Sequence, residues 1–301
     1  IVAEPYGMGK ADKDLDEAEA LFLEDKLLDL LCELLNLHHR KEYSKRFWKI
    51  ILGHWLRGYV RMMLNRIRTL QQCFQSHEIS GTTIYADGKY SLACLDTLSS
   101  IWACNDERWN LELNARILNL LTEKQIPLEI LDDNLCTSFL FEEILGISSL
   151  KVRIITWTRG KVAEFLTFFS RDSDAFIISS YLPKILELKL QVSLGQLPQL
   201  WTHTTPVLSE SIATDMFDRS LRKSLGSKID YESLDQLSAI SATLMFDCLP
   251  ICYLEGFNSV DNLIRRLPWP KKPKSIFTSN QFATNEIFKY WVAGKVELGT
   301  K

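Results

Sequence analysis

The stretch Ser275-Ile276-Phe277-Thr278-Ser279-Asn280 decides the fold class, because it combines a short apolar run with a polar turn. The Pro-rich residues 268–273 come before it and end the preceding helical pattern. The run over residues 275–278 predicts a strand, and the helical spacing of apolar residues over 284–297 predicts a helix. A strand followed by a helix is half of a βαβ unit, whose helix normally leads to a parallel strand of the same sheet. We therefore expect an α/β fold whose sheet continues beyond Lys301.

The rest of the chain predicts a helix-rich protein. The first half shows long helical periodicities with one short strand, and the second half alternates short strands with helices. We expect a mainly helical region over residues 1–126 and an α/β region with a parallel sheet over residues 127–301. The expected helices cover residues 15–37, 44–75, 92–123, 212–225, 233–248 and 260–267, and the further strands cover residues 83–85, 152–158 and 175–181.

The composition is that of an ordinary folded protein. The 301 residues are 46% hydrophobic and 24% charged, and 35 Lys and Arg against 38 Asp and Glu give a net charge of −3. This balance excludes disordered, collagen-like and small disulfide-stabilised chains. A chain coated by nucleic acid usually shows a basic domain, so we expect no nucleic-acid partner and expect any basic site to be local.

The cysteines and the apolar stretches indicate the compartment. The seven cysteines form no Cys-x-x-Cys pair and mostly lie among apolar residues, which is typical of a reducing, cytoplasmic location. No apolar stretch reaches the about 20 residues of a spanning helix, and residues 1–10 show no basic segment followed by an apolar core. We expect neither a transmembrane segment nor a secretory signal.

The helix predicted over residues 44–75 holds the first candidate site, because it has no acidic residue and a basic stripe along one side. Arg57 and Arg61 lie one turn apart on that stripe. An arginine side chain grips phosphate through two parallel hydrogen bonds, so both are candidates for binding a phosphorylated ligand. The preceding helix, residues 15–37, is strongly acidic, and the alternative is that the stripe lies against this helix or faces water.

The turn Thr278-Ser279-Asn280 is the second candidate. Open α/β sheets bind ligands beyond the carboxyl ends of their strands, and hydroxyl, amide and backbone N–H groups there suit a phosphate or a sugar. Lys289, in the following helix, is placed to reach an anion. The alternative is simple capping of the helix by this turn or by Thr284.

Four further residues are weaker candidates. Tyr181 and Gln196 follow a predicted strand, where aromatic and amide groups stack on and hydrogen-bond to sugars, although ordinary loop packing gives the same pattern. His54 lies in the basic helix, where it is either a catalytic acid or base or a buried histidine of the core whose hydrogen bonds are satisfied. Glu255 stands in an apolar setting, as a base or as the partner of a buried arginine.

The signatures of several common enzyme families are missing. The sequence has no GxGxxG, GxxxxGK[ST], GxSxG or HExxH motif. His38 and His39 are adjacent and lack a cysteine or carboxylate at the spacing of metal ligands. We therefore expect no metal site, no obligatory divalent ion and no cofactor.

Several stretches together resemble a leptospiral-type family of large bacterial transferases, in order and spacing from about Pro5 to Lys301. These stretches are Ser44-Lys45-Arg46-Phe47-Trp48, Gly53-His54-Trp55-Leu56, Asp106-Glu107-Arg108-Trp109-Asn110, Tyr253-Leu254-Glu255-Gly256-Phe257, Pro273-Lys274-Ser275-Ile276-Phe277-Thr278-Ser279-Asn280, and Phe288-Lys289 with Trp291.

The resemblance implies a fold and an activity. Members of that family look like glycosyltransferases of surface-polysaccharide assembly, with two Rossmann-like halves facing a cleft in a GT-B-like arrangement. It implies a nucleotide-activated sugar donor and a surface glycan or lipid-linked acceptor, in the cytoplasm or at the inner membrane face. The family extends past both ends of this chain, so the resemblance also implies a fragment, with its Rossmann-like portion incomplete at the C-terminus.

The alternative function is a non-catalytic binding or assembly module. Residues 15–75 would then form a docking surface whose cationic stripe meets an acidic protein or anionic lipid headgroups. The surroundings of Arg57 and Arg61 distinguish the two functions. A concave pocket shared with Asn280 favours an enzyme, a convex exposed face favours docking, and contact with the acidic helix supports neither.

Overall fold

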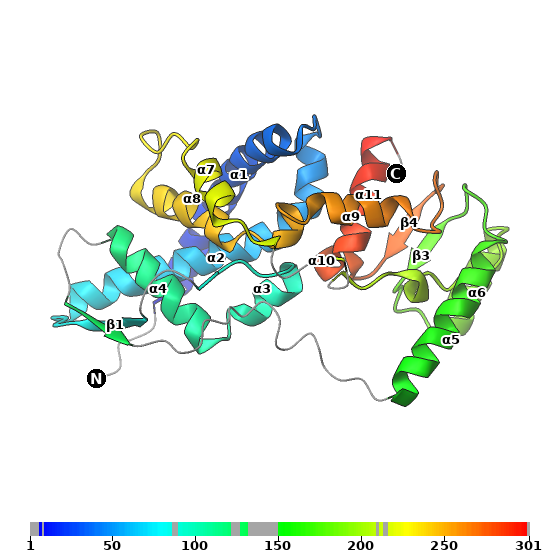
Figure 1. The fold of residues 1–301 in the computed structure, drawn as a ribbon, viewed down its shortest axis with the longest axis horizontal. Helices are drawn as coiled ribbons and strands as arrows, with labels where there is room; N and C mark the ends of the chain where they lie inside the picture. The colour runs from blue at the N-terminus through cyan, green and yellow to red at the C-terminus, as the bar shows by residue number, and fades with distance from the viewer. Residues whose placement is uncertain are drawn as a thin grey trace. The chain divides into compact units, whose positions relative to one another are not determined.

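The computed structural model describes residues 6–7, 9–85, 90–121, 127–131, 150–208, 211–212 and 216–299. The chain forms two compact units that are interleaved in the sequence (Figure 1). Unit 1 takes residues 1–42, 55–141 and 214–255, and unit 2 takes residues 43–54, 142–213 and 256–301. The boundary that the sequence predicts after residue 126 stays a prediction, because residues 122–126 lie outside the described ranges.

Within the described residues, unit 1 is mainly helical and contains one small parallel sheet. Its strands pair with Thr82 opposite Leu128 and Ile84 opposite Ile130. Its elements are α1 (Lys10–His39), the larger part of α2 (Lys45–Ser76), β1 (Thr82–Tyr85), α3 (Thr97–Ala103), α4 (Glu107–Leu121), β2 (Leu128–Leu131), α7 (Arg219–Gly226), α8 (Gln236–Cys248) and the 3-10 helix η4 (Ile251–Tyr253).

Unit 2 contains a second parallel pair of strands, with Phe176 opposite Ile276 and Ile178 opposite Thr278. The strands predicted over residues 175–181 and 275–278 are thus confirmed. Besides the first residues of α2, the elements of this unit are α5 (Leu150–Thr167), β3 (Phe176–Ile178), α6 (Lys184–Ser193), the 3-10 helix η1 (Trp201–Thr204), α9 (Phe257–Arg265), β4 (Ile276–Thr278), α10 (Gln281–Thr284) and α11 (Glu286–Glu297).

Two predicted elements are wrong. The strand expected over residues 152–158 lies within the 18 residues of helix α5, because the helical spacing of the whole segment outweighs the β-branched residues of a short window. The helix expected over residues 92–123 is two helices, α3 and α4. Each begins at an aspartate whose carboxylate accepts a backbone N–H, from Ser99 to Asp96 at 2.8 Å and from Trp109 to Asp106 at 2.7 Å.

Helix α1 confirms the helix predicted over residues 15–37. Two apolar side chains of its first half, Leu15 and Phe22, are nevertheless exposed. The reason is electrostatic, because this half turns its carboxylates toward arginines of α2, for example Glu17 toward Arg61. The residues buried in their place are Ala20, Leu23 and Leu27.

The core of unit 2 is built on aromatic rings around β3. The ring of Phe176 lies 4.5 Å from that of Trp291, 4.7 Å from that of Trp269 and 5.2 Å from that of Trp201, measured between ring centroids. These contacts join β3 to α11, to η1 and to the Pro-rich segment after α9. The Pro-rich stop that ends α9 therefore also brings Trp269 into the core.

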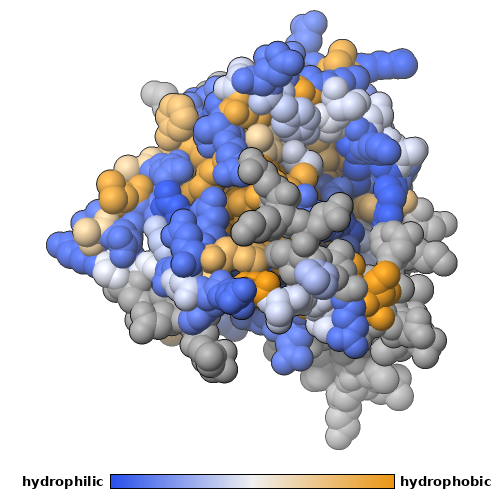
Figure 2. Space-filling view, turned by 90° about the vertical axis from the view of Figure 1, so that its left-hand side faces the viewer, coloured by the Kyte–Doolittle hydropathy of each residue, from blue (hydrophilic) through white to orange (hydrophobic). Residues whose placement is uncertain are grey.

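The described part of the chain contains no helix that is both long and apolar enough to cross a bilayer. Figure 2 shows one face of the molecule, on which hydrophilic side chains surround several separate hydrophobic areas.

A buried ion pair stabilises α11. The ammonium group of Lys289 lies 2.9 Å from the Glu286 carboxylate, and the two side chains are 0% and 1% exposed. Replacing Lys289 with methionine leaves the carboxylate buried without its cation. We expect Lys289→Met to lower the free energy of unfolding by about 3–5 kcal/mol. Urea denaturation should show this loss, and the double variant Lys289→Met/Glu286→Gln should recover most of it. A double variant as unstable as the single one would contradict this account.

A second prediction concerns acid stability. His39 ends α1, and its Nε2 lies 3.2 Å from the carbonyl oxygen of Tyr253. Burial lowers the pKa of His39 to about 4, and the positive charge of Lys41 acts in the same direction. Between about pH 6.5 and pH 4, His39 is therefore protonated in the unfolded chain and neutral in the folded chain. Stability should fall as the pH drops from about 6.5 toward 4, by about 1–2 kcal/mol between about pH 7.5 and pH 5. In His39→Gln this part of the pH dependence, measured by urea denaturation, should disappear.

Candidate functional site

A cavity of about 660 Å³ opens in unit 1 beside α4, α7 and α8. Its volume lies within the range of about 300–1,000 Å³ that is usual for sites of small molecules. We call it the α7 cavity. Its polar and aromatic lining includes Tyr90, Glu112, Arg116, Arg219, Arg222, Lys223, Tyr231, Thr243, Phe246 and Asp247.

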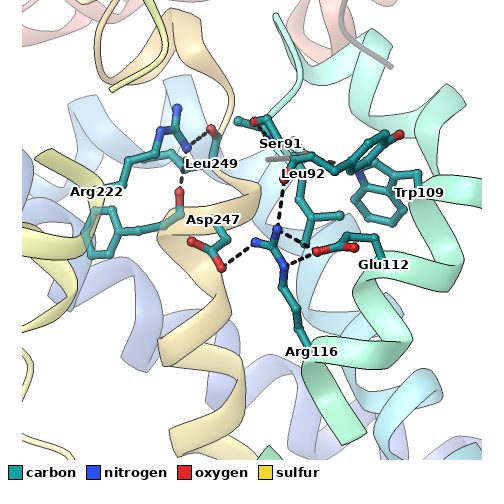
Figure 3. Close-up of polar contacts among 11 residues, drawn as sticks. Ser91, Leu92, Trp109, Glu112, Arg116, Arg222, Asp247 and Leu249 are labelled. Atoms are coloured by element: carbon teal, nitrogen blue, oxygen red, sulfur yellow. Dashed lines mark hydrogen bonds and ion pairs between the residues drawn. The ribbon is translucent and has the colours of Figure 1, made fainter. Parts of the chain in front are cut away.

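Arg116 of α4 forms one wall of the α7 cavity, and its charge is balanced within the protein. Its side chain lies between two carboxylates (Figure 3), with Nη1 at 2.8 Å from Asp247 and Nε at 2.8 Å from Glu112. Nη2 donates to the carbonyl oxygen of Tyr90 at 2.9 Å. This guanidinium group therefore connects α4, α8 and the chain before α3, and it adds no unbalanced charge to the cavity.

Arg222 of α7 is buried and also fully engaged. Its Nε and Nη2 each donate to the Glu255 carboxylate at 2.7 Å, and the two side chains are 1% and 5% exposed. Its Nη1 donates to the carbonyl oxygens of Phe246 and Leu249, at 2.5 Å and 2.7 Å. Glu255 is thus the partner of a buried arginine, which is one of the two roles that the sequence allows for it.

Arg219 and Lys223 differ from these two arginines. Both lie on α7 one turn apart, both are exposed, and both line the α7 cavity. Within the residues that the structure describes, neither has an ion-pair partner. With Glu255, which neutralises Arg222, the four cations of the described lining stand against three carboxylates. The net excess is one positive charge, and Arg219 and Lys223 are the two cations of this lining without an ion pair.

The basic stripe of α2 lies against α1 in unit 1. Arg61 donates from Nε to Glu17 at 3.0 Å, and both Arg57 and Arg61 lie 3.4 Å from the Glu24 carboxylate. The hydrogen bond from Arg61 lowers the pKa of the Glu17 carboxyl group. Arg57 and Arg61 thus contact the acidic helix, as in the alternative stated for the basic stripe. In that case these arginines support neither an enzyme nor a docking surface.

The strand ends of unit 2 bring together Tyr181 and the turn Thr278-Ser279-Asn280. Ser279 Oγ donates to the carbonyl oxygen of Ser180 at 2.7 Å, and the amide of Asn280 hydrogen-bonds the Tyr181 hydroxyl. Tyr181 is 76% exposed and has a φ of 56°, a conformation that few side chains adopt without strain. This turn also serves the helix that follows it, because the Thr278 hydroxyl accepts the N–H of Gln281 at 3.2 Å.

The other predicted residues have separate positions. Gln196 is buried and makes two hydrogen bonds to the backbone of Ala175, at 2.7 Å and 2.8 Å, so it holds the start of β3. Lys289 is buried against Glu286, away from solvent. His54 is exposed on α2, whereas its alternative as a core histidine requires burial.

Arg116, Arg219 and Lys223 are residues that the sequence patterns do not single out. They come from α4 and α7, which are about 100 residues apart in the chain, and they meet only through the fold. The spacing of Arg219 and Lys223 on a helix capped by Asp218 is the one local signal. A pair of basic residues one turn apart is, however, common on exposed helices.

Three Asp-x-Asp triplets occur in the sequence, Asp12-Lys13-Asp14, Asp14-Leu15-Asp16 and Asp172-Ser173-Asp174. Throughout the described ranges, no group of three or more His, Cys, Asp or Glu side chains is placed to hold a metal ion.

Comparison with known proteins identifies the family. A family model described as LIC12162 family transferase matches residues 7–301. Searches of curated proteins and of solved structures found no match. Since the family model spans nearly the whole sequence, the chain belongs to the LIC12162 family of transferases.

Proposed function

We propose that this transferase moves a sugar from a nucleotide-activated donor to a glycan or lipid-linked acceptor, and that the α7 cavity binds the donor. The observation that supports this assignment is the pair Arg219 and Lys223, two exposed cations on one helix that face a cavity and have no carboxylate of their own within the described chain. The membership in a transferase family supports the reaction class.

The lining of the α7 cavity suits the parts of a nucleotide donor. A diphosphate carries negative charge and acceptor oxygens, which an arginine fork and a lysine ammonium bind through charge-assisted hydrogen bonds. Tyr90, Tyr231 and Phe246 supply flat apolar surface for a base or a sugar ring. Ser91, Asn119 and Thr243 add neutral hydrogen-bonding groups to the same lining.

In the proposed reaction, a hydroxyl oxygen of the acceptor forms a bond to the anomeric carbon of the donor. The bond from that carbon to the phosphate oxygen breaks, and the nucleotide leaves with the electron pair. Arg219 and Lys223 stabilise the negative charge that develops on the phosphate. Asp247 is 39% exposed and Glu112 only 13%, so Asp247 is the lining carboxylate placed to take the proton of the acceptor hydroxyl.

The strand ends of unit 2 are the second part of the proposal. We assign β3 and β4 to a Rossmann-like, GT-B-like portion, in which Tyr181, Ser279 and Asn280 contact sugar or phosphate groups beyond the carboxyl ends of parallel strands. The exposed ring of Tyr181 and its hydrogen bond to Asn280 support this assignment.

A lipid-linked acceptor would place the reaction at the cytoplasmic face of the membrane. The exposed apolar side chains of α6, including Ile185 and Val192, lie among Lys184 and Lys189. Apolar residues interspersed with lysines are the usual means of peripheral binding to an anionic bilayer.

Nucleotide binding tests the proposed function. Titration calorimetry with UDP, GDP, dTDP and CMP should show saturable binding of at least one nucleotide, with and without EDTA, because no metal is expected in the site. Arg219→Ala and Lys223→Ala should each weaken that binding about tenfold, since each removes a charge-assisted contact worth about 1.4 kcal/mol.

Two matched variants serve as controls for the nucleotide titrations. Lys228→Ala removes an exposed cation that follows α7 and does not line the cavity, and Arg61→Ala removes the paired arginine of α2. Both should bind the nucleotide as the unaltered chain does. If no nucleotide binds, or if the α7 variants bind as tightly as the controls, the donor assignment is wrong.

A further inference from the structure

Unit 2 contains a second, smaller cavity whose walls are aromatic. It has a volume of about 260 Å³, just below the range of about 300–1,000 Å³ that is usual for drug-sized ligands, so it fits a single ring better than a nucleotide. We call it the aromatic pocket. Its rings belong to Tyr43, Phe47, Phe257, Trp269, Tyr290 and Trp291.

The rim of the aromatic pocket is positively charged. Arg265, Lys271 and Lys295 line it, against the single carboxylate of Asp261, which lies 2.9 Å from Arg265. The ammonium group of Lys295 donates to the carbonyl oxygen of Lys271 at 2.8 Å and lies 5.7 Å from the centre of the Trp291 ring. Burial lowers the pKa of Lys295. The described lining thus holds three cations and one carboxylate beside an apolar floor, and Asp172, outside the lining, also acts on Lys295.

Gly294 leaves free space beside α11 at the pocket. It lies in the interior of α11 and lines the pocket, and a Cβ atom added there would meet no atom within 4 Å. Glycine destabilises the interior of a helix relative to larger residues. Packing does not require it at this position, because the space is free, whereas a side chain here would project into the pocket.

We propose that the aromatic pocket binds a single sugar ring that carries a carboxylate or phosphate group. The aromatic walls pack against the C–H face of such a ring, Asp261 accepts hydrogen bonds from its hydroxyls, and Lys271 and Lys295 bind its anionic group. Binding of such a ring is independent of the proposed function. Its identification as part of the acceptor glycan rests on the proposed function.

Calorimetric titration of the full chain tests the chemical class. The probes are D-glucuronate and glucose 1-phosphate, with neutral glucose, benzoate and inorganic phosphate as comparisons. We expect saturable binding of glucuronate, glucose 1-phosphate or both, at least tenfold tighter than that of the three comparisons. The preference between the two acids distinguishes a carboxylate from a phosphate ligand.

Two variants locate the binding in the aromatic pocket. Gly294→Leu fills the free space and should abolish binding while the melting temperature stays equal or rises. Lys295→Met should weaken the binding of the anionic sugars at least tenfold. The matched controls are Gly58→Leu, also a helical glycine with free space around it but outside both cavities, and Lys272→Met, an exposed lysine next to the rim. Both controls should bind as the unaltered chain does.

The proposal is overturned if no sugar acid binds, if benzoate or inorganic phosphate binds as tightly, or if Gly294→Leu keeps both its fold and its affinity. A nucleotide titration of Gly294→Leu separates this failure from that of the proposed function. If Gly294→Leu still binds the nucleotide, the donor assignment holds whatever the result of the sugar titrations. If the unaltered chain binds the sugar acids but no nucleotide, the aromatic pocket binds sugars but has no role in donor-dependent transfer.

Discussion

The architecture of the α7 cavity depends on the buried guanidinium group of Arg222. Burying a charge costs several kcal/mol unless every polar atom finds a partner. Arg222 meets this condition with the two carboxylate oxygens of Glu255 and the carbonyl oxygens of Phe246 and Leu249. One side chain thereby joins α7 to the end of α8 and to the segment after η4. Since α7 is fixed in this way, the neighbouring residues Arg219 and Lys223 are held at the cavity, where neither has an ion-pair partner among the described residues.

Compensation of charge separates structural cations from cations that can bind a ligand. Arg57 and Arg61 have carboxylates of α1, Arg116 has Glu112 and Asp247, and Lys289 has Glu286. The pairs of Arg57, Arg61 and Arg116 stabilise contacts between segments, whereas the pair of Lys289 lies within α11. In all of them the carboxylate offsets the positive charge, which weakens the attraction for an external anion. Arg219 and Lys223 remain without such partners in the described chain, and for this reason they, and not the longer basic stripe of α2, support the donor site.

Local sequence patterns predict the elements of this fold better than they predict its site. β3 and β4 follow from short apolar runs, and the long helices follow from helical periodicity. For Glu255, a carboxylate in an apolar setting, the sequence leaves two alternatives, and the structure contains the one in which it pairs with a buried arginine. The α5 segment shows the limit, because its β-branched residues favour a strand over a short window while the longer period is helical. Arg116, Arg219 and Asp247 become neighbours only through packing, which no spacing along the chain encodes. Arg57 and Arg61 stand out in the sequence because of charge, yet the same charge draws them to the adjacent acidic helix.

The stretch Tyr253-Leu254-Glu255-Gly256-Phe257, one of those that resemble the transferase family, contributes to both cavities by different chemistry. In unit 1, Glu255 neutralises Arg222 and so fixes the helix that lines the α7 cavity. In unit 2, Phe257 begins α9 and forms part of the aromatic wall. Within three residues, this stretch therefore contains one residue that supports the charged α7 cavity and one that forms a wall of the aromatic pocket. A substitution at Glu255 acts through the position of α7 and not through contact with a ligand, whereas one at Phe257 changes a pocket wall directly, so the two neighbours perform distinct functions in one motif.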